Sequence, residues 1–145
     1  VGWLNHMCKL PVKVAHQGEA LAPGVIYIAP GGAHLRVSAQ NSFVINTIPQ
    51  TARFMPSCDI LLESVARVYG YKAVGIVLTG MGDDGARGLL AMAQAGAFTI
   101  AQDENTSTVF GMPGEAARLG AARQVLPLSK IAPVLTSLSK IGVTT

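Results

Sequence analysis

Two adjacent carboxylates, Asp83 and Asp84, lie in a glycine-rich loop that spans residues 80–85. The loop directly follows residues 73–78, which are almost wholly apolar, as in a strand that is covered on both faces. The carboxyl end of a parallel strand is where an α/β protein places its binding and catalytic groups. This loop is therefore the first candidate for chemistry in the chain.

The same loop satisfies the pattern G-x-G-x-x-G, follows a predicted strand and precedes a predicted helix, as a dinucleotide-binding turn does. Such a turn offers backbone N–H groups and a positive helix end to a pyrophosphate. Asp83 and Asp84 would face that dianion, and like charges about 4 Å apart repel by roughly 4 kcal/mol per pair at an effective dielectric constant of about 20. A nucleotide-binding domain is therefore the weaker alternative. The plainest structural interpretation is that Asp84 caps the helix that follows it.

The other candidate residues are scattered. No G-x-S-x-G pattern occurs, and His6, His16 and His34 lack the close spacing of zinc ligands, so neither a nucleophile elbow nor a metal site is expected. His34 follows a Pro-Gly-Gly-Ala stretch and is expected to be a hydrogen-bonded turn residue beside a sheet edge. Met81 and Met112 lie in glycine-containing loops rather than on a helical face, which makes them candidates to line a cleft.

The elements that must position these residues follow from periodicity and from turn residues. A helix that Ser57 caps and Gly70 ends is predicted, with Leu61, Val65 and Val68 on one apolar face, and Ser129 is predicted to cap the last helix. A β-hairpin formed by residues 35–38 and 43–46 is also predicted. Alternation of strands with helices predicts an α/β fold with a mostly parallel sheet, to which the hairpin is an antiparallel addition. The predicted strands cover residues 12–15, 25–29, 35–38, 43–46, 73–78, 98–101 and 124–126, and the predicted helices cover 57–69, 86–95, 113–119 and 129–140.

Composition narrows the class of protein. The chain has 145 residues, enough for one domain with a real core, and half of them are hydrophobic. The net charge is +3, but the eleven Lys and Arg residues are dispersed, which argues against a nucleic-acid partner. No apolar run reaches the roughly 18 residues that insert into a membrane. Cys8 and Cys58 are widely spaced and are expected to be reduced thiols of a cytoplasmic protein.

Several blocks of the sequence resemble the catalytic domain of the chemotaxis protein-glutamate methylesterases. The similarity runs nearly end to end, and the block L-T-G-M-G-x-D-G is its most specific part. F-G-M-P follows that block at the spacing that is seen in the family. The matching segments are 3–5, 23–31, His34, 56–62, 78–85, Gln102 and 110–113.

This resemblance implies a Rossmann-like, doubly wound fold and the hydrolysis of glutamate methyl esters on methyl-accepting chemotaxis receptors, in some members with deamidation of receptor glutamines. The family uses a Ser-His-Asp triad without a cofactor, and its triad aspartate corresponds to Asp84. The position of Asp83 varies in the family, so no essential role is implied for it. The backbone N–H of Met81 is implied as an oxyanion donor, with Gly82 and Met112 beside it as cleft candidates.

The serine and histidine of the family triad precede the segment that matches this chain. Residues 1–145 are therefore expected to form the C-terminal portion of one catalytic domain, without its first strands and without the regulatory receiver domain. Such a fragment is expected to be inactive on its own, with an apolar sheet edge that favours association. The alternative is a non-catalytic module of the same fold that binds receptors.

Overall fold

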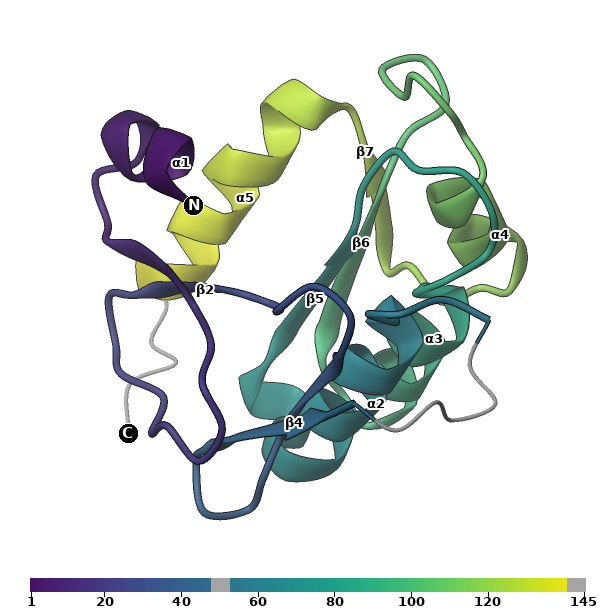
Figure 1. Ribbon diagram of the computed structural model, residues 1–145. Coiled ribbons are helices and arrows are strands. Elements are labelled where there is room, and N and C mark those ends of the chain that lie inside the picture. Colours follow the sequence, from purple (N-terminus) through teal and green to yellow (C-terminus); the bar gives the residue numbers. More distant parts are fainter. Residues whose placement is uncertain (48–52, 141–145) are drawn as a thin grey trace.

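The computed structural model describes residues 1–47 and 53–140. Every strand and helix predicted above is present, as is a short helix at the start of the chain (Figure 1). The helices are α1 (Gly2–Met7), α2 (Cys58–Tyr69), α3 (Ala86–Gln94), α4 (Met112–Arg118) and α5 (Leu128–Lys140), with a 3-10 turn at Gly70–Lys72. The strands are β1 (Val12–Val14), β2 (Ile26–Ile28), β3 (His34–Val37), β4 (Phe43–Asn46), β5 (Val74–Val77), β6 (Phe98–Gln102) and β7 (Gln124–Leu126).

The strands form two parallel groups and one antiparallel hairpin. Strands β5, β6 and β7 pair in that order, all parallel, and β1 pairs with β2 in parallel. Strands β3 and β4 form the predicted hairpin, in which His34 is opposite Asn46 and Val37 is opposite Phe43. The mixed α/β class with mostly parallel strands is confirmed, although the two parallel groups share no ladder in the described residues.

Helices α2 and α3 pack closely against each other and against the sheet (Figure 1). Leu89 of α3 is completely buried in a cluster with Val77 of β5 and Ala101 of β6. Gly88 allows the two helices to approach, because a Cβ at this position would lie 2.7 Å from Cβ of Leu62 on α2. This contact brings the first turns of the two helices together beneath the loop that carries Asp84.

The hairpin packs on the other side of α2. Phe43 and Leu35 are buried in a cluster with Leu61, Val65 and Val68, which confirms the apolar face predicted for this helix. Helix α2 therefore lies between the hairpin and α3, and it links the two halves of the chain.

Two local predictions were wrong. His34 is not in a turn but is the first residue of β3, and it is completely buried, because the strand carries it underneath the start of α2. Helix α5 begins at Leu128, so Ser129 lies inside the helix instead of capping it. In the described ranges, no helix combines the length and the apolar composition needed to cross a membrane.

Candidate functional site

Asp84 lies in the loop that connects β5 to α3, and it is only 9% exposed. Gly82 and Gly85, on either side of Asp84, have φ values of +87° and +90°, which residues other than glycine rarely adopt. At Gly85 a Cβ would also lie 3.2 Å from Cβ of Cys58. The two glycines therefore turn the loop back so that Asp84 meets the beginning of α2.

The carboxylate of Asp84 accepts three hydrogen bonds from the N-terminus of α2. Oδ1 accepts from the hydroxyl of Ser57 at 2.8 Å and from the backbone N–H of Asp59 at 3.1 Å. Oδ2 accepts from the backbone N–H of Cys58 at 2.7 Å. These donors belong to the positive end of the helix, where a negative charge is stabilised.

The interpretation that Asp84 caps the helix following it is wrong. The N-cap of α3 is Gly85, which has no side chain, and Asp84 makes no cap hydrogen bond to that helix. Asp84 instead binds the N-terminus of α2, about 25 residues earlier in the chain. Ser57 is the N-cap of α2, as predicted, and its hydroxyl both accepts from the N–H of Ile60 at 3.4 Å and donates to Asp84.

In turn, Asp59 of helix α2 accepts hydrogen bonds from the start of α3. Its side chain is buried, with the residue 6% exposed. Its Oδ1 accepts from the backbone N–H of Gly88 at 2.7 Å, and its Oδ2 accepts from Nε of Arg87 at 3.2 Å. The first turn of α2 is thus bonded by Asp84 from the loop before α3, and the first turn of α3 is bonded by Asp59 of α2. This exchange fixes the position of Asp84 relative to both helices.

The hydrogen bonds of Asp84 suit an ionised carboxylate with one acceptor position remaining. An ionised carboxylate offers about four lone-pair positions, two on each oxygen. Oδ1 accepts two hydrogen bonds and Oδ2 accepts one, all from N–H or O–H donors. Within the described residues, Asp84 has no histidine partner. By this count one position remains, on Oδ2, beside the Cys58 thiol, whose hydrogen bond to the Asp84 carboxylate helps to raise the pKa of that thiol.

Cys58 lies beside Asp84 but is not an activated nucleophile. Although the residue is exposed at the surface, partial burial of its thiol and then the negative charge of Asp84 raise its pKa from 9.0 to about 11. A thiol with this pKa is protonated at neutral pH, whereas the thiolate is the reactive form.

The backbone of the acidic loop is held by the segment before α4. The carbonyl of Gly80 accepts from the N–H groups of Gly111 and Met112, at 3.2 and 2.9 Å. The N–H of Gly80 donates to the carbonyl of Val109 at 3.1 Å. A side chain at Gly80 would displace Met112, since a Cβ would lie 2.3 Å from its sulfur.

The three cleft candidates lie in different environments, and Met112 is the first residue of α4 instead of lying in a loop. Met112 lines a cavity of about 300 Å³ together with Cys58 and Leu62. Met81 is 83% exposed. Gly82 faces Phe54, to which a Cβ would approach within 3.3 Å.

Gln102, at the end of β6, supports the same loop from below. It is 1% exposed, and its Oε1 accepts from the N–H of Thr79 at 2.8 Å. Its Nε2 donates to the carbonyl of Thr106 at 2.8 Å. Neither this role nor the contact between Ser57 and Asp84 follows from residue patterns, because both join segments more than 20 residues apart.

The histidines do not form a metal or nucleophile site. His34 accepts from the N–H of Ser57 through Nδ1 at 3.3 Å, which places its proton on Nε2, where no hydrogen-bond partner lies in the described part of the chain. His6 contacts the carbonyl of Gly2 in α1. Among residues 1–47 and 53–140, no group of three or more His, Cys, Asp or Glu side chains could hold a metal ion.

Comparison with known proteins places this site in a family. The sequence model described as CheB methylesterase matches residues 1–135. A protein-glutamate methylesterase/protein-glutamine glutaminase 2 of Xanthomonas oryzae is 50% identical over 139 residues, which cover 94% of this chain and 39% of that protein. Protein-glutamate methylesterase FrzG of Myxococcus xanthus is 47% identical over 133 residues, which cover 92% of this chain and 40% of that protein.

The fold agrees with that of a solved CheB methylesterase structure. The crystal structure of the CheB methylesterase catalytic domain of Thermotoga maritima has a TM-score of 0.89 and 38% sequence identity, and the match covers 94% of this chain and 74% of that one. The chain spans about two fifths of the length of the curated relatives it matches. In both sequence and fold, the chain belongs to the CheB methylesterase family.

Proposed function

We propose that the full-length protein hydrolyses glutamate methyl esters on methyl-accepting chemotaxis receptors, with Asp84 as the acid of a Ser-His-Asp triad. The observation that carries this proposal is the state of the Asp84 carboxylate, which is buried, held by three donors and able to accept one more at Oδ2. The names of the relatives support the substrate class, because they are protein-glutamate methylesterases.

The role of Asp84 follows from triad chemistry. Its carboxylate accepts the ring N–H of the histidine, which fixes the tautomer and stabilises the imidazolium that forms when the serine gives up its proton. The serine oxygen attacks the ester carbonyl, and the imidazolium then protonates the departing methoxide oxygen, so that methanol leaves and an acyl-enzyme forms. Water hydrolyses the acyl-enzyme by the same route. The three donors from α2 support this role, because they keep the carboxylate in place while the imidazole alternates between its two states.

The oxyanion that develops during attack needs backbone donors. We assign this role to the N–H of Met81, with Gly82 beside it, at the tip of the loop that Gly80 anchors. Support comes from the fixed carbonyl of Gly80 and from the exposure of Met81, which leaves the loop tip open to a substrate. A preorganised donor of this kind contributes about 3 kcal/mol to the transition state.

In this proposal the serine and histidine belong to the longer protein and not to residues 1–145, so the 145 residues alone are inactive. The full-length protein would also contain a receiver domain that controls access to the site. Deamidation of receptor glutamines is the second reaction open to the same triad, and the double name of the Xanthomonas oryzae relative favours it.

The test is methanol release from methylated receptor, measured for the full-length protein, for residues 1–145 and for two full-length variants. We expect activity only in the full-length protein and a loss of about 10⁴-fold in turnover for Asp84→Ala. Asp83→Ala is the matched control, because that side chain is 63% exposed and contacts only Arg53 in the described structure, at 3.9 Å.

Two outcomes would reject the proposal. Activity in residues 1–145 would place the nucleophile within this chain. A full-length protein that binds receptors but releases no methanol would be the non-catalytic receptor-binding module. A shift of the melting temperature with NAD or ATP would favour the nucleotide-binding alternative.

A further inference from the structure

His34 is a completely buried residue that the proposed mechanism does not use. It is the first residue of β3, and its Nδ1 accepts from the backbone N–H of Ser57 at 3.3 Å. A backbone N–H can only donate, so the ring carries its proton on Nε2. Within residues 1–47 and 53–140, nothing pairs with Nε2. The imidazole therefore enters the fold as a hydrogen-bond acceptor.

The N–H of Ser57 needs an acceptor from outside helix α2. Ser57 is the N-cap of this helix and is only 5% exposed, so its N–H is buried and takes no part in the helical hydrogen bonds. In a capping box, a Glu or Gln three residues later accepts from that N–H. Here the residue three positions later is Ile60, whose side chain cannot accept. His34 supplies the acceptor from a different element.

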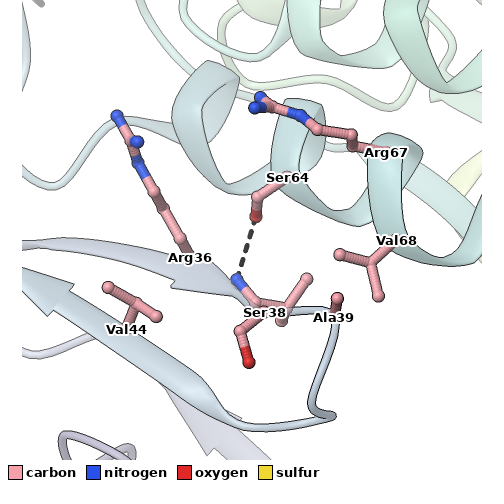
Figure 2. A pocket seen from close by; sticks show the side chains of 8 residues that line it. Arg36, Ser38, Ala39, Val44, Ser64, Arg67 and Val68 are labelled. Atoms are coloured by element: carbon pink, nitrogen blue, oxygen red, sulfur yellow. Dashed lines mark hydrogen bonds between the residues drawn. The ribbon is translucent and has the colours of Figure 1, made fainter.

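Strand β3 is fixed along α2 at a second point as well. The N–H of Val37 donates to the hydroxyl of Ser64 at 3.0 Å, drawn as the dashed line in Figure 2. These two residues also line a cavity of about 460 Å³, together with Arg36 and Arg67. From His34 to Val37 the strand covers about 10 Å, and from Ser57 to Ser64 the helix covers about 10.5 Å. The two contacts are therefore in register, and the fold itself brings the imidazole to the start of α2.

Ser57 is held at both of its polar groups. Its N–H donates to His34, and its hydroxyl donates to Oδ1 of Asp84 at 2.8 Å. The other two donors to Asp84 are backbone N–H groups of α2, so the hydroxyl is the one donor of the three that lies on a rotatable side chain. The place of that hydroxyl depends on the backbone of Ser57, which precedes the first turn of the helix and which His34 holds.

Packing alone does not explain an imidazole at position 34. A buried N–H without a partner costs stability, and Nε2 of His34 carries one. An apolar side chain of similar volume, such as leucine, would fill the site without that cost. The acceptor at Nδ1 is the property of His34 that leucine lacks.

We propose that His34 is a positioning residue of the active site. By holding the backbone of Ser57, it keeps the Ser57 hydroxyl on Oδ1 of Asp84 and so keeps Oδ2 turned towards the triad histidine. His34 takes up no proton in the reaction and acts only through Ser57. The role assigned to His34 rests on the proposed triad, to which it adds a support that reaches from the hairpin through the start of α2.

The test is methanol release from methylated receptor by the full-length protein, with two substitutions that separate the acceptor from the volume. His34→Asn keeps an acceptor, because Oδ1 of asparagine is bonded to Cγ as Nδ1 of histidine is, but it fills less of the site. His34→Leu keeps most of the volume and has no acceptor. We expect kcat to stay within about threefold in His34→Asn and to fall about 10- to 100-fold in His34→Leu, with KM changed less than about twofold in both. Packing alone predicts the reverse order, because asparagine leaves a larger void.

A double-mutant cycle shows whether His34 acts through Ser57. Ser57→Ala removes the hydroxyl that His34 positions, so adding His34→Leu to it should lower kcat by less than about twofold more. Two independent roles would instead multiply the two losses. In the unaltered protein, NMR of the imidazole nitrogens of His34 should show a proton on Nε2 and none on Nδ1.

Unchanged kcat in His34→Leu, multiplied losses in the cycle, or a proton on Nδ1 would each overturn the role of His34 and leave the triad standing. If His34→Leu shows no melting transition, His34→Asn and the NMR measurement decide. A folded His34→Asn variant that loses as much turnover as Ser57→Ala then overturns the role. No methanol release by the unaltered full-length protein would reject the proposed function, and the role of His34 with it.

Discussion

Charges of opposite sign lie at the two ends of helix α2, and they differ in burial and in hydrogen bonding. At the N-terminus, the carboxylate of Asp84 is buried and accepts three hydrogen bonds from the helix. Towards the C-terminus, Arg67 is exposed beside an open cavity and forms no ion pair in the described residues. Both charges suit the helix dipole, so charge placement alone does not distinguish a structural group from a binding group.

The two ends of α2 differ in the hydrogen-bonding partners that the rest of the chain provides. Asp84 is brought to α2 by the loop after β5, and the chain returns an acid, Asp59, to the start of α3. No ion pair in the described residues involves Arg67. The first end of α2 is therefore held rigidly by buried hydrogen bonds, whereas the charge near the second end lies at the surface.

The largest loss of stability is expected for Asp84→Ala. This change leaves the hydroxyl of Ser57 and the N–H groups of Cys58 and Asp59 without their acceptor. We expect the free energy of unfolding to fall by about 3 kcal/mol, as for the loss of hydrogen bonds to a buried charge. Urea denaturation followed by circular dichroism would measure this. A change as small as that of Asp83→Ala would mean that the start of α2 does not depend on this carboxylate.

Gly88→Ala tests whether the close approach of α2 and α3 holds the acid exchange together. The new methyl group would lie 2.7 Å from Cβ of Leu62 and 2.9 Å from the carbonyl oxygen of Asp59. Because part of this contact is backbone, we expect a loss of about 2 kcal/mol by urea denaturation. Gly2→Ala in α1 is the control, since a Cβ there would contact nothing within 4 Å. Equal stability of the two variants would show that the helices can move apart freely.

Ser57→Ala and Arg67→Gln compare the two ends of α2 directly. The first change removes both a helix cap and one donor to Asp84, and it should cost about 1 kcal/mol of unfolding free energy. Ser57→Thr should recover most of the loss, because it keeps the hydroxyl. Arg67→Gln should change stability by less than about 0.5 kcal/mol, as for an exposed side chain without a partner in the described residues. A larger loss for Arg67→Gln than for Ser57→Ala would reverse the comparison.

The smallest expected effect on stability is the pH dependence that the thiol of Cys58 contributes. Burial, and then the charge of Asp84, raise the pKa of this thiol to about 11. Ionisation is disfavoured in the folded state, so the contribution of the thiol to stability is complete below its ordinary pKa of 9.0 and is lost as the pH rises towards about 11. In a Cys8→Ser background, iodoacetamide should alkylate Cys58 slowly until the pH approaches about 11.

Asp84→Asn should lower the pKa of Cys58, because it removes the neighbouring negative charge, and should speed alkylation at a fixed pH. An alkylation profile centred on the ordinary pKa of 9.0 in the unaltered protein would contradict the environment described for this thiol.

Local patterns predicted the elements well, because each depends on residues close in sequence. The apolar face of α2, its Ser57 cap and the hairpin are all of this kind. The role of Asp84 was different, since the sequence around it is equally consistent with a cap for the next helix. Only the packing of α2 on α3 decides which N-terminus receives the carboxylate.

The placement of His34 and of the two arginines depended on the same long-range packing. A Pro-Gly-Gly-Ala stretch before His34 suggests a turn, but its imidazole is held by the N–H of Ser57, 23 residues later. Arg36 and Arg67 are 31 residues apart, and no pattern in the sequence relates them. They line the same cavity because the N–H of Val37 on β3 donates to the hydroxyl of Ser64 on α2, which joins the two elements that carry them.

The most direct test of the triad proposal is a crystal structure of the full-length protein at a resolution that separates the two oxygens of Asp84. We expect the hydroxyl of Ser57 to remain on Oδ1 and a histidine ring N–H to donate to Oδ2. An imidazole that displaces Ser57 from Oδ1, or an Asp84 that contacts no imidazole at all, would contradict the assignment of Asp84 as a triad acid supported by helix α2.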